Sequence, residues 1–469
     1  MKIMLIRGDI ISSSHHAHPP VVPANEFITD FTAWHNKPKP SLNKAILAFG
    51  VLTFLGVLGI VIKLFTVGLE NRSDWGYLAA ITAFLFSTAG CTPFVVLGLR
   101  MIKAHWRRPI ARIAESYSLV TVVTFSLVLL LLFLIPSSQN RRTIWFQNDH
   151  IGTVGAIPFT PHLYVIIGIL CMVLAGLGLW WLSLKPDLRL FNNLKKTDKP
   201  TNKSWVGNLK QWRVHNKGLA FLGAFFFLTF IWAITLYCVD LCMSLVPGWR
   251  DAIFPVYQTL SGIQGGLATV ILSMYFLRRF GGFEKYIFME HFWAASKPLL
   301  ATCLLWFYFW FCAFIIFWYG RMPIEQDLLQ LIMFGPYNIA FFIGFSCCFL
   351  IPFLILVWNF VRKTVWGPPV ASAIIIVGCF FDKVRLYVSS YSVQDDLALH
   401  AITEIPATIL PNLTDLLIII GGISLPIFIM LLSTRLFPII SVWEMVEGLR
   451  LTKMTKYLRT ELRVLGKPE

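Results

Sequence analysis

The chain has 469 residues, of which 57% are hydrophobic and 15% aromatic, and its mean hydropathy is +0.69. This composition excludes a soluble domain of this size, because soluble domains carry roughly 45–50% apolar residues. The formal net charge of +16 lies in the segments between the apolar runs, so it does not indicate nucleic-acid binding. We therefore expect a membrane protein.

Ten long apolar runs predict ten transmembrane helices. A helix needs about 20 apolar residues to cross ~30 Å of hydrocarbon, and lipid cannot satisfy the open backbone groups of other structures. The predicted spans are 45–68, 76–98, 117–136, 163–184, 218–245, 252–276, 298–319, 331–357, 370–391 and 413–434. We expect an all-α polytopic fold with an arm (1–43), spans 1–4 (44–184), a basic loop (185–217), spans 5–10 (218–436) and a tail (437–469).

Lysine and arginine concentrate in alternate loops. The 100–116 loop carries five of them, and the 185–217 and 277–297 loops are basic too, whereas 392–412 has three acids and neither Lys nor Arg. Because cytoplasmic loops are enriched in Lys and Arg, this pattern predicts cytoplasmic termini in the bacterial inner membrane. No cleavable signal peptide is visible in the arm, so the first span is expected to direct insertion. The tail 439–469 predicts an amphipathic helix on the cytoplasmic surface, in contact with lipid.

Histidine and cysteine positions limit the cofactors that this chain is expected to hold. None of the ten histidines falls inside a predicted span, which argues against a haem held by histidines from within the spans. The nine cysteines form no CxxC motif and no Cys/His ligand spacing. We therefore expect no haem, iron–sulfur cluster or metal site in this chain.

Ionisable residues inside predicted spans are functional hypotheses by default, because burying charge in lipid is costly. They lie toward the predicted outer side of the membrane and comprise Lys63, Asp240, Asp382, Lys383, Arg385 and Asp415. Structural alternatives exist for most of them. Lys63 can extend to the interface, Asp415 fits the first turn of a helix, and Asp382 can pair with Arg385 three residues later. Asp240 has no basic neighbour in its own span.

A carboxylate and a basic residue near the outer surface suit quinol oxidation. A carboxylate can accept a hydroxyl proton, and a cation can stabilise the developing quinolate. Trp249, Phe254, Tyr257 and Tyr387 are near enough in sequence to hold the ring. The alternative for each is an ordinary aromatic at the membrane interface.

Several segments after residue 230 share motifs with one family. They are 240–257 (DLCMSLVPGWRDAIFPVY), 291–302 (HFWAASKPLLAT), 318–325 (WYGRMPIE) and 378–385 (GCFFDKVR). These motifs resemble the NrfD/PsrC-like (polysulfide reductase) membrane subunits, especially those of alternative complex III, a quinol-oxidising respiratory assembly. The resemblance implies two four-helix bundles, spans 2–5 and 6–9, with spans 1 and 10 outside them.

The resemblance also implies partners and roles. Such subunits oxidise menaquinol or ubiquinol, or reduce the quinone, near the extracytoplasmic side. They exchange electrons with an iron–sulfur subunit and a multihaem cytochrome c subunit, and a second NrfD-like subunit can be present. Asp240 then corresponds to the quinol-site carboxylate, and Arg385 with Asp382 and Lys383 to an acidic and basic pair.

The sequence also departs from the family pattern. Thr88-Ala-Gly90 stands where relatives commonly have a histidine before Ala-Gly, and Ile234 or Thr235 replaces a second histidine. His150 or His162 is a candidate substitute in the quinone site. The departures favour an alternative, a non-catalytic scaffold or a proton-conducting subunit with a path through Asp240, Asp382 and Asp415.

A third hypothesis is a transporter unrelated to redox chemistry. The glycines of span 6 (Gly262, Gly265, Gly266) suit it. Glycines at this spacing are equally explained as helix-packing contacts.

Overall fold

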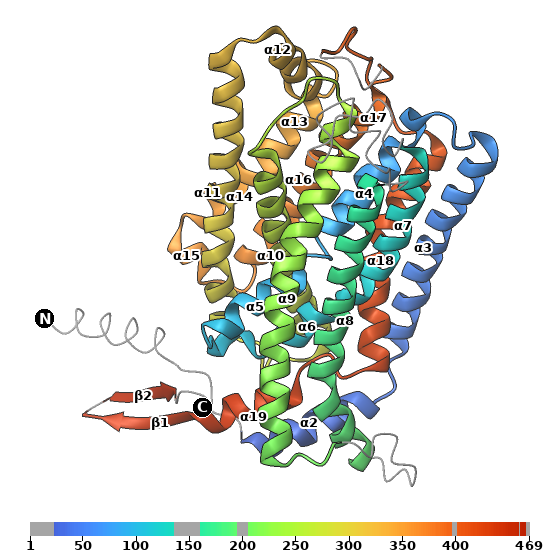
Figure 1. The fold of residues 1–469 in the computed structure, drawn as a ribbon. Helices are drawn as coiled ribbons and strands as arrows, with labels where there is room; N and C mark the ends of the chain where they lie inside the picture. Colours follow the sequence, from blue (N-terminus) through green and yellow to red (C-terminus); the bar gives the residue numbers. More distant parts are fainter. Residues whose placement is uncertain (1–22, 136–159, 195–204, 396–400, 459, 466–469) are drawn as a thin grey trace, which may run out of the picture.

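A computed structural model describes residues 23–135, 160–194, 205–395, 401–458 and 460–465 (Figure 1). The predicted all-α polytopic fold is confirmed. In this described part, nine helical segments are long and apolar enough to cross a membrane: Pro40–Thr66, Arg72–Met101, Ala111–Leu134, His162–Leu190, Leu209–Leu245, Phe254–Gly281, Met289–Gly320, Asn338–Leu356 and Leu413–Leu436. The stretch predicted as span 9 is also helical, from Gly367 to Ser392, but is not among these nine.

The first group of helices forms predicted spans 2–5. Its elements are η1 (Arg72–Trp75), α4 (Gly76–Ser87), α5 (Thr92–Met101), η2 (His105–Arg107), α6 (Ala111–Ser116), α7 (Ser118–Leu134), α8 (Thr160–Leu194), α9 (Leu209–Leu241) and η4 (Met243–Leu245). Neighbours in sequence pack against each other, and α9 returns to α5. The helix of predicted span 2 is interrupted between the end of α4 at Ser87 and the start of α5 at Thr92.

The second group forms predicted spans 6–9. Its elements are α10 (Phe254–Gly281), α11 (Met289–Gly320), α12 (Pro323–Leu329), η5 (Gln330–Phe334), α13 (Asn338–Phe345), η6 (Ser346–Leu350), α14 (Ile351–Leu356), α15 (Asn359–Arg362), α16 (Gly367–Lys383), η7 (Val384–Val388) and α17 (Ser389–Ser392). The segments η5, η6 and η7 are π-helical turns, which often occur at functional sites. Helix α10 packs on α11 and α16 and also on α9 and α5, so it joins the two groups.

Three of the four glycines of α10 lie against the interruption of span 2, between α4 and α5. A Cβ atom at Gly262 would lie 2.7 Å from the Cys91 sulfur, and one at Gly265 would lie 2.9 Å from the Ser87 carbonyl oxygen. A Cβ atom at Gly266 would meet the Cys91 backbone at 3.0 Å. Close helix packing therefore explains these glycines.

Helices α3 (Pro40–Thr66) and α18 (Leu413–Leu436), predicted spans 1 and 10, pair beside α4. Their backbones meet where a Cβ on Gly56 would lie 2.5 Å from the Gly421 Cα. Lys63 is buried and forms an ion pair with Asp415, so the expectation that it extends to the interface is wrong. Asp415 does occupy the first turn of α18, where it accepts the Asn412 N–H at 3.1 Å.

Two end regions of the molecule can be named from Figure 1: the α12 end and the opposite α19 end, where α2 (Ala24–Asn36) and α19 (Val442–Leu451) pack together. The predicted tail helix is wrong beyond Leu451, because β1 (Thr452–Tyr457) and β2 (Thr460–Leu465) form an antiparallel hairpin there. The arm also contains α2, whose Phe27 and Phe31 are buried.

Two further expectations need correction. Helices extend beyond the apolar runs, so His162, His215 and His291 lie within α8, α9 and α11 rather than outside the spans. The 100–116 segment was predicted as a basic loop between spans, but it is largely helical. It folds into η2 and α6, and Arg108 and Arg112 are buried.

Candidate functional site

The buried charges predicted in span 9 form one cluster with α10. The Asp382 Oδ1 atom accepts hydrogen bonds from the Tyr257 hydroxyl at 2.6 Å and from Arg385 Nε at 3.0 Å and Nη2 at 2.8 Å. Arg385 Nη2 also donates to the Tyr257 oxygen at 2.9 Å. Asp382 and Arg385 therefore form the internal ion pair that their spacing allowed, with Tyr257 as a third member.

Lys383 points to the other side of this cluster. Its Nζ atom donates to Gln258 Oε1 at 2.6 Å and to Ser261 Oγ at 3.2 Å, and it lies 3.5 Å from Asp382 Oδ2. All three charged groups are almost completely buried. The π-helical turn η7 begins directly after Lys383, so the local widening of the helix lies beside these charges.

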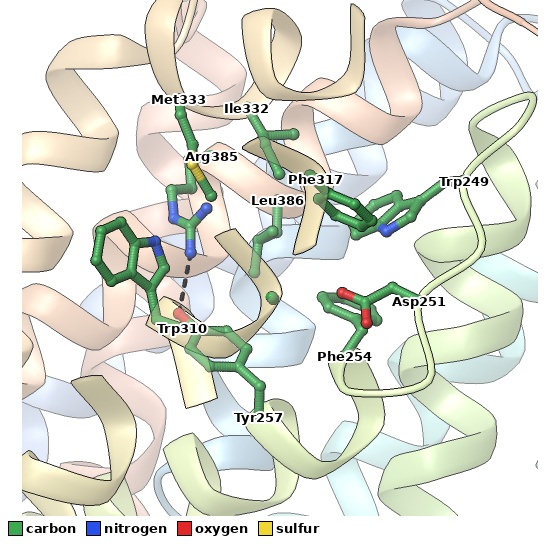
Figure 2. Close-up of a pocket in the computed structure, with 11 residues that line it drawn as sticks. Trp249, Asp251, Phe254, Tyr257, Trp310, Phe317, Ile332, Met333, Arg385 and Leu386 are labelled. Carbon is green, nitrogen blue, oxygen red and sulfur yellow. Dashed lines mark hydrogen bonds between the residues drawn. The ribbon is translucent and has the colours of Figure 1, made fainter. Parts of the chain in front are cut away.

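A pocket lies beside the cluster toward the α12 end (Figure 2). It is lined by Trp249, Asp251, Phe254, Tyr257, Trp310, Ala313, Phe317, Ile332, Met333, Arg385 and Leu386. Its cavity volume is about 30 Å³, which is room for a water molecule or two rather than for a ring. Figure 2 places Arg385, Tyr257 and Trp310 on one side and Trp249, Asp251 and Phe254 on the other.

Three hydrogen-bond donors of the pocket-lining residues lack an acceptor. Within the described residues, Arg385 Nη1, Trp249 Nε1 and Trp310 Nε1 are buried and make no hydrogen bond. Leaving buried donors without acceptors costs about 1–3 kcal/mol each, so such groups usually have a functional reason. These N–H groups lie within the walls of the pocket, on opposite sides of it, and its accessible surface is almost entirely apolar.

The pocket also contains a carboxylate, that of Asp251, in the connection between η4 and α10. One of its oxygens accepts the Ile253 N–H at 2.7 Å. Burial raises the pKa of Asp251 above its ordinary value, although main-chain hydrogen bonds from Ile253 and Phe254 oppose the shift. A carboxylate with a raised pKa is a better proton acceptor near neutral pH.

The structure distributes the predicted site residues unevenly. Trp249, Tyr257 and Arg385 line the pocket, and Asp382 contacts two of them. Asp240 and Lys383 are buried outside the pocket lining, as is His162 near the start of α8. Asp415 pairs with Lys63 between α3 and α18 instead. His150 lies outside the described residues.

Sequence reasoning missed several pocket residues, chiefly Asp251, Trp310 and Met333. Asp251 was visible in the 240–257 motif, since acids are scarce near span ends. Trp310 and Met333 lie in aromatic or apolar runs that carry no distinguishing signal, and only the packing of α11 on α10 and of η5 on η7 brings them together.

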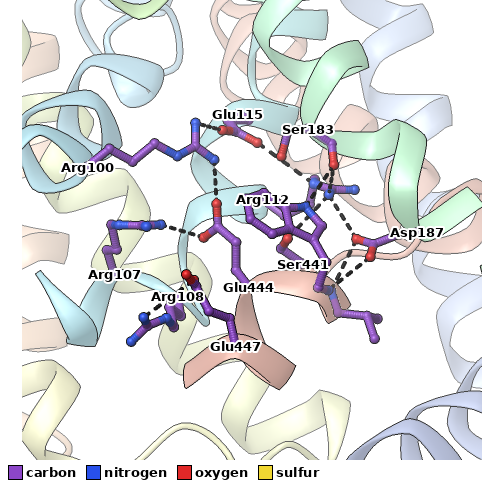
Figure 3. A network of polar contacts seen from close by, with 12 residues as sticks. Arg100, Arg107, Arg108, Arg112, Glu115, Ser183, Asp187, Ser441, Glu444 and Glu447 are labelled. Carbon is purple, nitrogen blue, oxygen red and sulfur yellow. Dashed lines mark hydrogen bonds and ion pairs between the residues drawn. The ribbon is translucent and has the colours of Figure 1, made fainter. Parts of the chain in front are cut away.

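A second charge cluster, which we call the α19 network, lies at the α19 end (Figure 3). Arg100 pairs with Glu115 and, at 2.8 Å, with Glu444, which also accepts Arg107 at 2.6 Å. Arg112 donates to Asp187 at 2.9 Å, and Arg108 lies 3.4 Å from Glu447. These are the arginines of the predicted basic loop.

The α19 network attaches α19 to the helix bundle. Glu444 is fully buried, and the Val442 and Trp443 N–H groups donate to Asp187 at 3.1 and 3.0 Å. Burial would raise the pKa of Glu444, but Arg100 and Arg107 outweigh this effect and lower it below the ordinary value. Glu444, one of the three charged residues of α19, therefore points into protein, whereas Glu447 is partly exposed and Arg450 is exposed.

Comparisons with known proteins add no identification. No protein-family model matches the sequence, and no curated protein matches it. Within the described residues, no group of three or more His, Cys, Asp or Glu side chains could hold a metal ion. The resemblance to NrfD-like subunits stays a prediction.

Proposed function

We propose that this chain is a membrane subunit of a quinone-linked electron-transfer complex, similar to the NrfD-like subunits of alternative complex III. In this proposal the pocket holds the quinone head group. The observation that carries it is the set of unpartnered donors, Arg385 Nη1 with the Trp249 and Trp310 indoles, around one aromatic space. A quinone is a flat ring with an acceptor oxygen at each end, so it would satisfy these donors once the lining side chains move apart to admit it.

The chemistry assigned to the pocket is quinol oxidation. Oxidation of one quinol releases two electrons and two protons. Arg385 stabilises the quinolate oxygen that forms when the first proton leaves. Asp251 accepts that proton because its pKa is raised, passes it to bulk water and then accepts the second proton in the same way. The electrons pass to an extracytoplasmic iron–sulfur and cytochrome partner. Asp240 remains the alternative proton acceptor.

Quinone binding by the purified complex tests the pocket. Arg385→Lys keeps a cation next to Asp382 but removes the Nη1 donor, so we expect the quinone affinity to fall by about 1.5–3 kcal/mol, roughly ten- to hundredfold in Kd. The matched control is Lys285→Gln, an exposed residue at the α19 end. Equal quinone affinity in the two variants would refute the proposal that the pocket binds quinone.

Turnover distinguishes the two candidate proton acceptors. Asp251→Asn should reduce quinol oxidation strongly while leaving assembly intact, and Asp240→Asn should have the smaller effect. The reverse order would return the role to Asp240. Unchanged turnover in both variants would remove both carboxylates from the chemistry.

A second candidate function is a scaffold subunit of the same kind of complex. The specific observation that favours it is the ion pairing of Asp382 with Arg385 and Lys383, which compensates the carboxylate and one of the two positive charges predicted to act on quinol. This candidate predicts that the complex purifies without quinone in this chain and that the Arg385→Lys complex turns over normally.

A further inference from the structure

The hairpin that follows α19 projects away from the rest of the molecule. Its strands pair from Thr452 with Leu465 to Tyr457 with Thr460. Figure 1 shows it at the α19 end, beside the bundle, extended across the direction of the long helices rather than along it. It packs mainly against α19 through β1. A lone two-stranded hairpin is at best marginally stable in water, so a contacting surface would stabilise it.

The hairpin exposes basic and apolar side chains together. Lys453 and Lys456 are exposed, and Val464, which pairs directly with Lys453, is 49% exposed. Directly paired residues share one face of a hairpin. In sequence, residues 450–465 contain five basic residues and a single acid. Exposed apolar and basic groups on one element are typical of segments that lie at a membrane surface.

The tip of the hairpin carries Leu458, which is 81% exposed. Its φ is 56°, in the left-handed region that costs a non-glycine residue energy. Exposure of this large apolar side chain to water is unfavourable, and its backbone strain adds to the cost. It would gain from insertion among lipid head groups.

We propose that the hairpin binds anionic phospholipid head groups of the leaflet at the α19 end. Lys453 contacts a phosphate from the face that it shares with Val464. Lys456 does so from the opposite face, where its register partner is Glu461, and Leu458 inserts between head groups. Because the membrane plane runs across the spanning helices, an element extended across them lies along that plane. The α19 network holds the start of the hairpin at this level through Glu444. This proposal does not depend on quinone binding.

The test uses the full-length protein in nanodiscs, with Leu458→Cys labelled by an environment-sensitive NBD dye. The parent chain treated with the same reagent corrects for its native cysteines. We expect blue-shifted, brighter emission in discs of phosphatidylcholine with phosphatidylglycerol, compared with phosphatidylcholine alone. High salt should reverse the shift, because it screens charge.

The matched variants change charge at two positions in the labelled background. Lys453→Glu with Lys456→Glu should abolish the shift, and the Lys→Arg pair should retain it. Emission that is identical in both lipids and equally quenched by aqueous iodide would show the hairpin facing water, which overturns the proposal. A shift that survives charge reversal, or that rises with protein concentration in detergent, would assign the tip to apolar insertion alone or to a second protein chain and would also overturn it.

Discussion

The two ends of the molecule both bury arginine beside carboxylate, but they use the pairs differently. At the α19 end, Arg100 and Arg107 share Glu444, and the partners come from segments far apart in sequence. At the α12 end, Arg385 and Asp382 lie three residues apart on one helix. The first arrangement connects elements, whereas the second orients a side chain.

The two sites do not differ in whether every N–H group of their arginines has an acceptor. In the described residues, Arg112 Nη1 lacks a partner just as Arg385 Nη1 does. The surroundings differ, because Arg385 lines an aromatic pocket and Arg112 lies between α8 and α19. An unpartnered donor therefore suggests a ligand only where there is space for one, and the following predictions test this distinction.

The largest expected effect is on the α19 network. Glu444→Gln leaves Arg100 and Arg107 buried with one fewer counter-charge, and breaking a buried ion pair costs about 3–5 kcal/mol. We expect α19 to detach and the melting temperature in detergent to fall. Limited proteolysis of the tail and a melting curve measure both changes.

The control for this prediction is Glu447→Gln on the same helix. Its carboxylate is 37% exposed and lies 3.4 Å from Arg108, so its loss should cost about 0–1 kcal/mol. If the two variants melt alike, the α19 network does not attach α19.

The second prediction concerns the Lys63–Asp415 pair, whose carboxylate was a candidate for a proton path. Asp415→Asn should destabilise by about 3–5 kcal/mol, because it leaves Lys63 buried without its partner. Replacing both, as Lys63→Met with Asp415→Leu, should restore most of the stability. Electron-transfer turnover that persists in the double variant assigns the pair to helix packing, and lost turnover in a stable double variant returns Asp415 to the proton path.

Sequence patterns predicted the membrane fold well because lipid imposes a strong constraint. Each predicted span lies in helical structure. Helices α10 and α4 both pack across the boundary between predicted spans 2–5 and 6–9, so the division into two four-helix bundles stays a prediction. Helix ends were predicted less well. His215 and His291 lie in helical turns beyond the apolar core, since helices continue where polar residues can still be covered by protein.

Partners far apart in sequence could not be predicted. The basic residues of 100–116 predicted a cytoplasmic loop, and nothing local shows that Glu444 lies beside Arg100. Asp382 and Arg385 were predicted as a pair because their spacing is local. Tyr257 joins them only through the packing of α10 on α16 and η7, so its role as a hydrogen-bond partner became visible in three dimensions alone.

A third prediction compares two tryptophans whose indole N–H groups both lack acceptors in the described residues. Trp249 lines the pocket, whereas Trp306 is fully buried outside it. Phenylalanine at either position removes the N–H and about the same volume, so stability should fall alike. Only Trp249→Phe should weaken quinone binding, by about 0.5–1.5 kcal/mol. Titration with a soluble quinone measures this, and an equal loss in both variants would count against the pocket.

The smallest effect is a difference in pH dependence between two carboxylates outside the spans. The pKa of Glu444 is lowered, so its contribution to stability is present above the unfolded value and is lost only as pH falls through the lower folded value. The pKa of Asp251 is raised by burial, so stability falls as the pH rises and Asp251 ionises in the folded protein. On acidification Asp251 takes up its proton at a higher pH than an ordinary aspartate, and it then no longer acts as a base.

Lowering the pH should therefore stop turnover before it releases α19. Quinol oxidation should decline at a pH above the ordinary aspartate value of about 3.9, while α19 should stay protease-resistant to below the ordinary glutamate value of about 4.3. Asp251→Asn should remove the titration of turnover without changing the release of α19. Release of α19 before the loss of turnover would contradict the lowered pKa of Glu444. If Arg100 and Arg107 lower that pKa by more than burial raises it, Glu444 must stay ionised in acid.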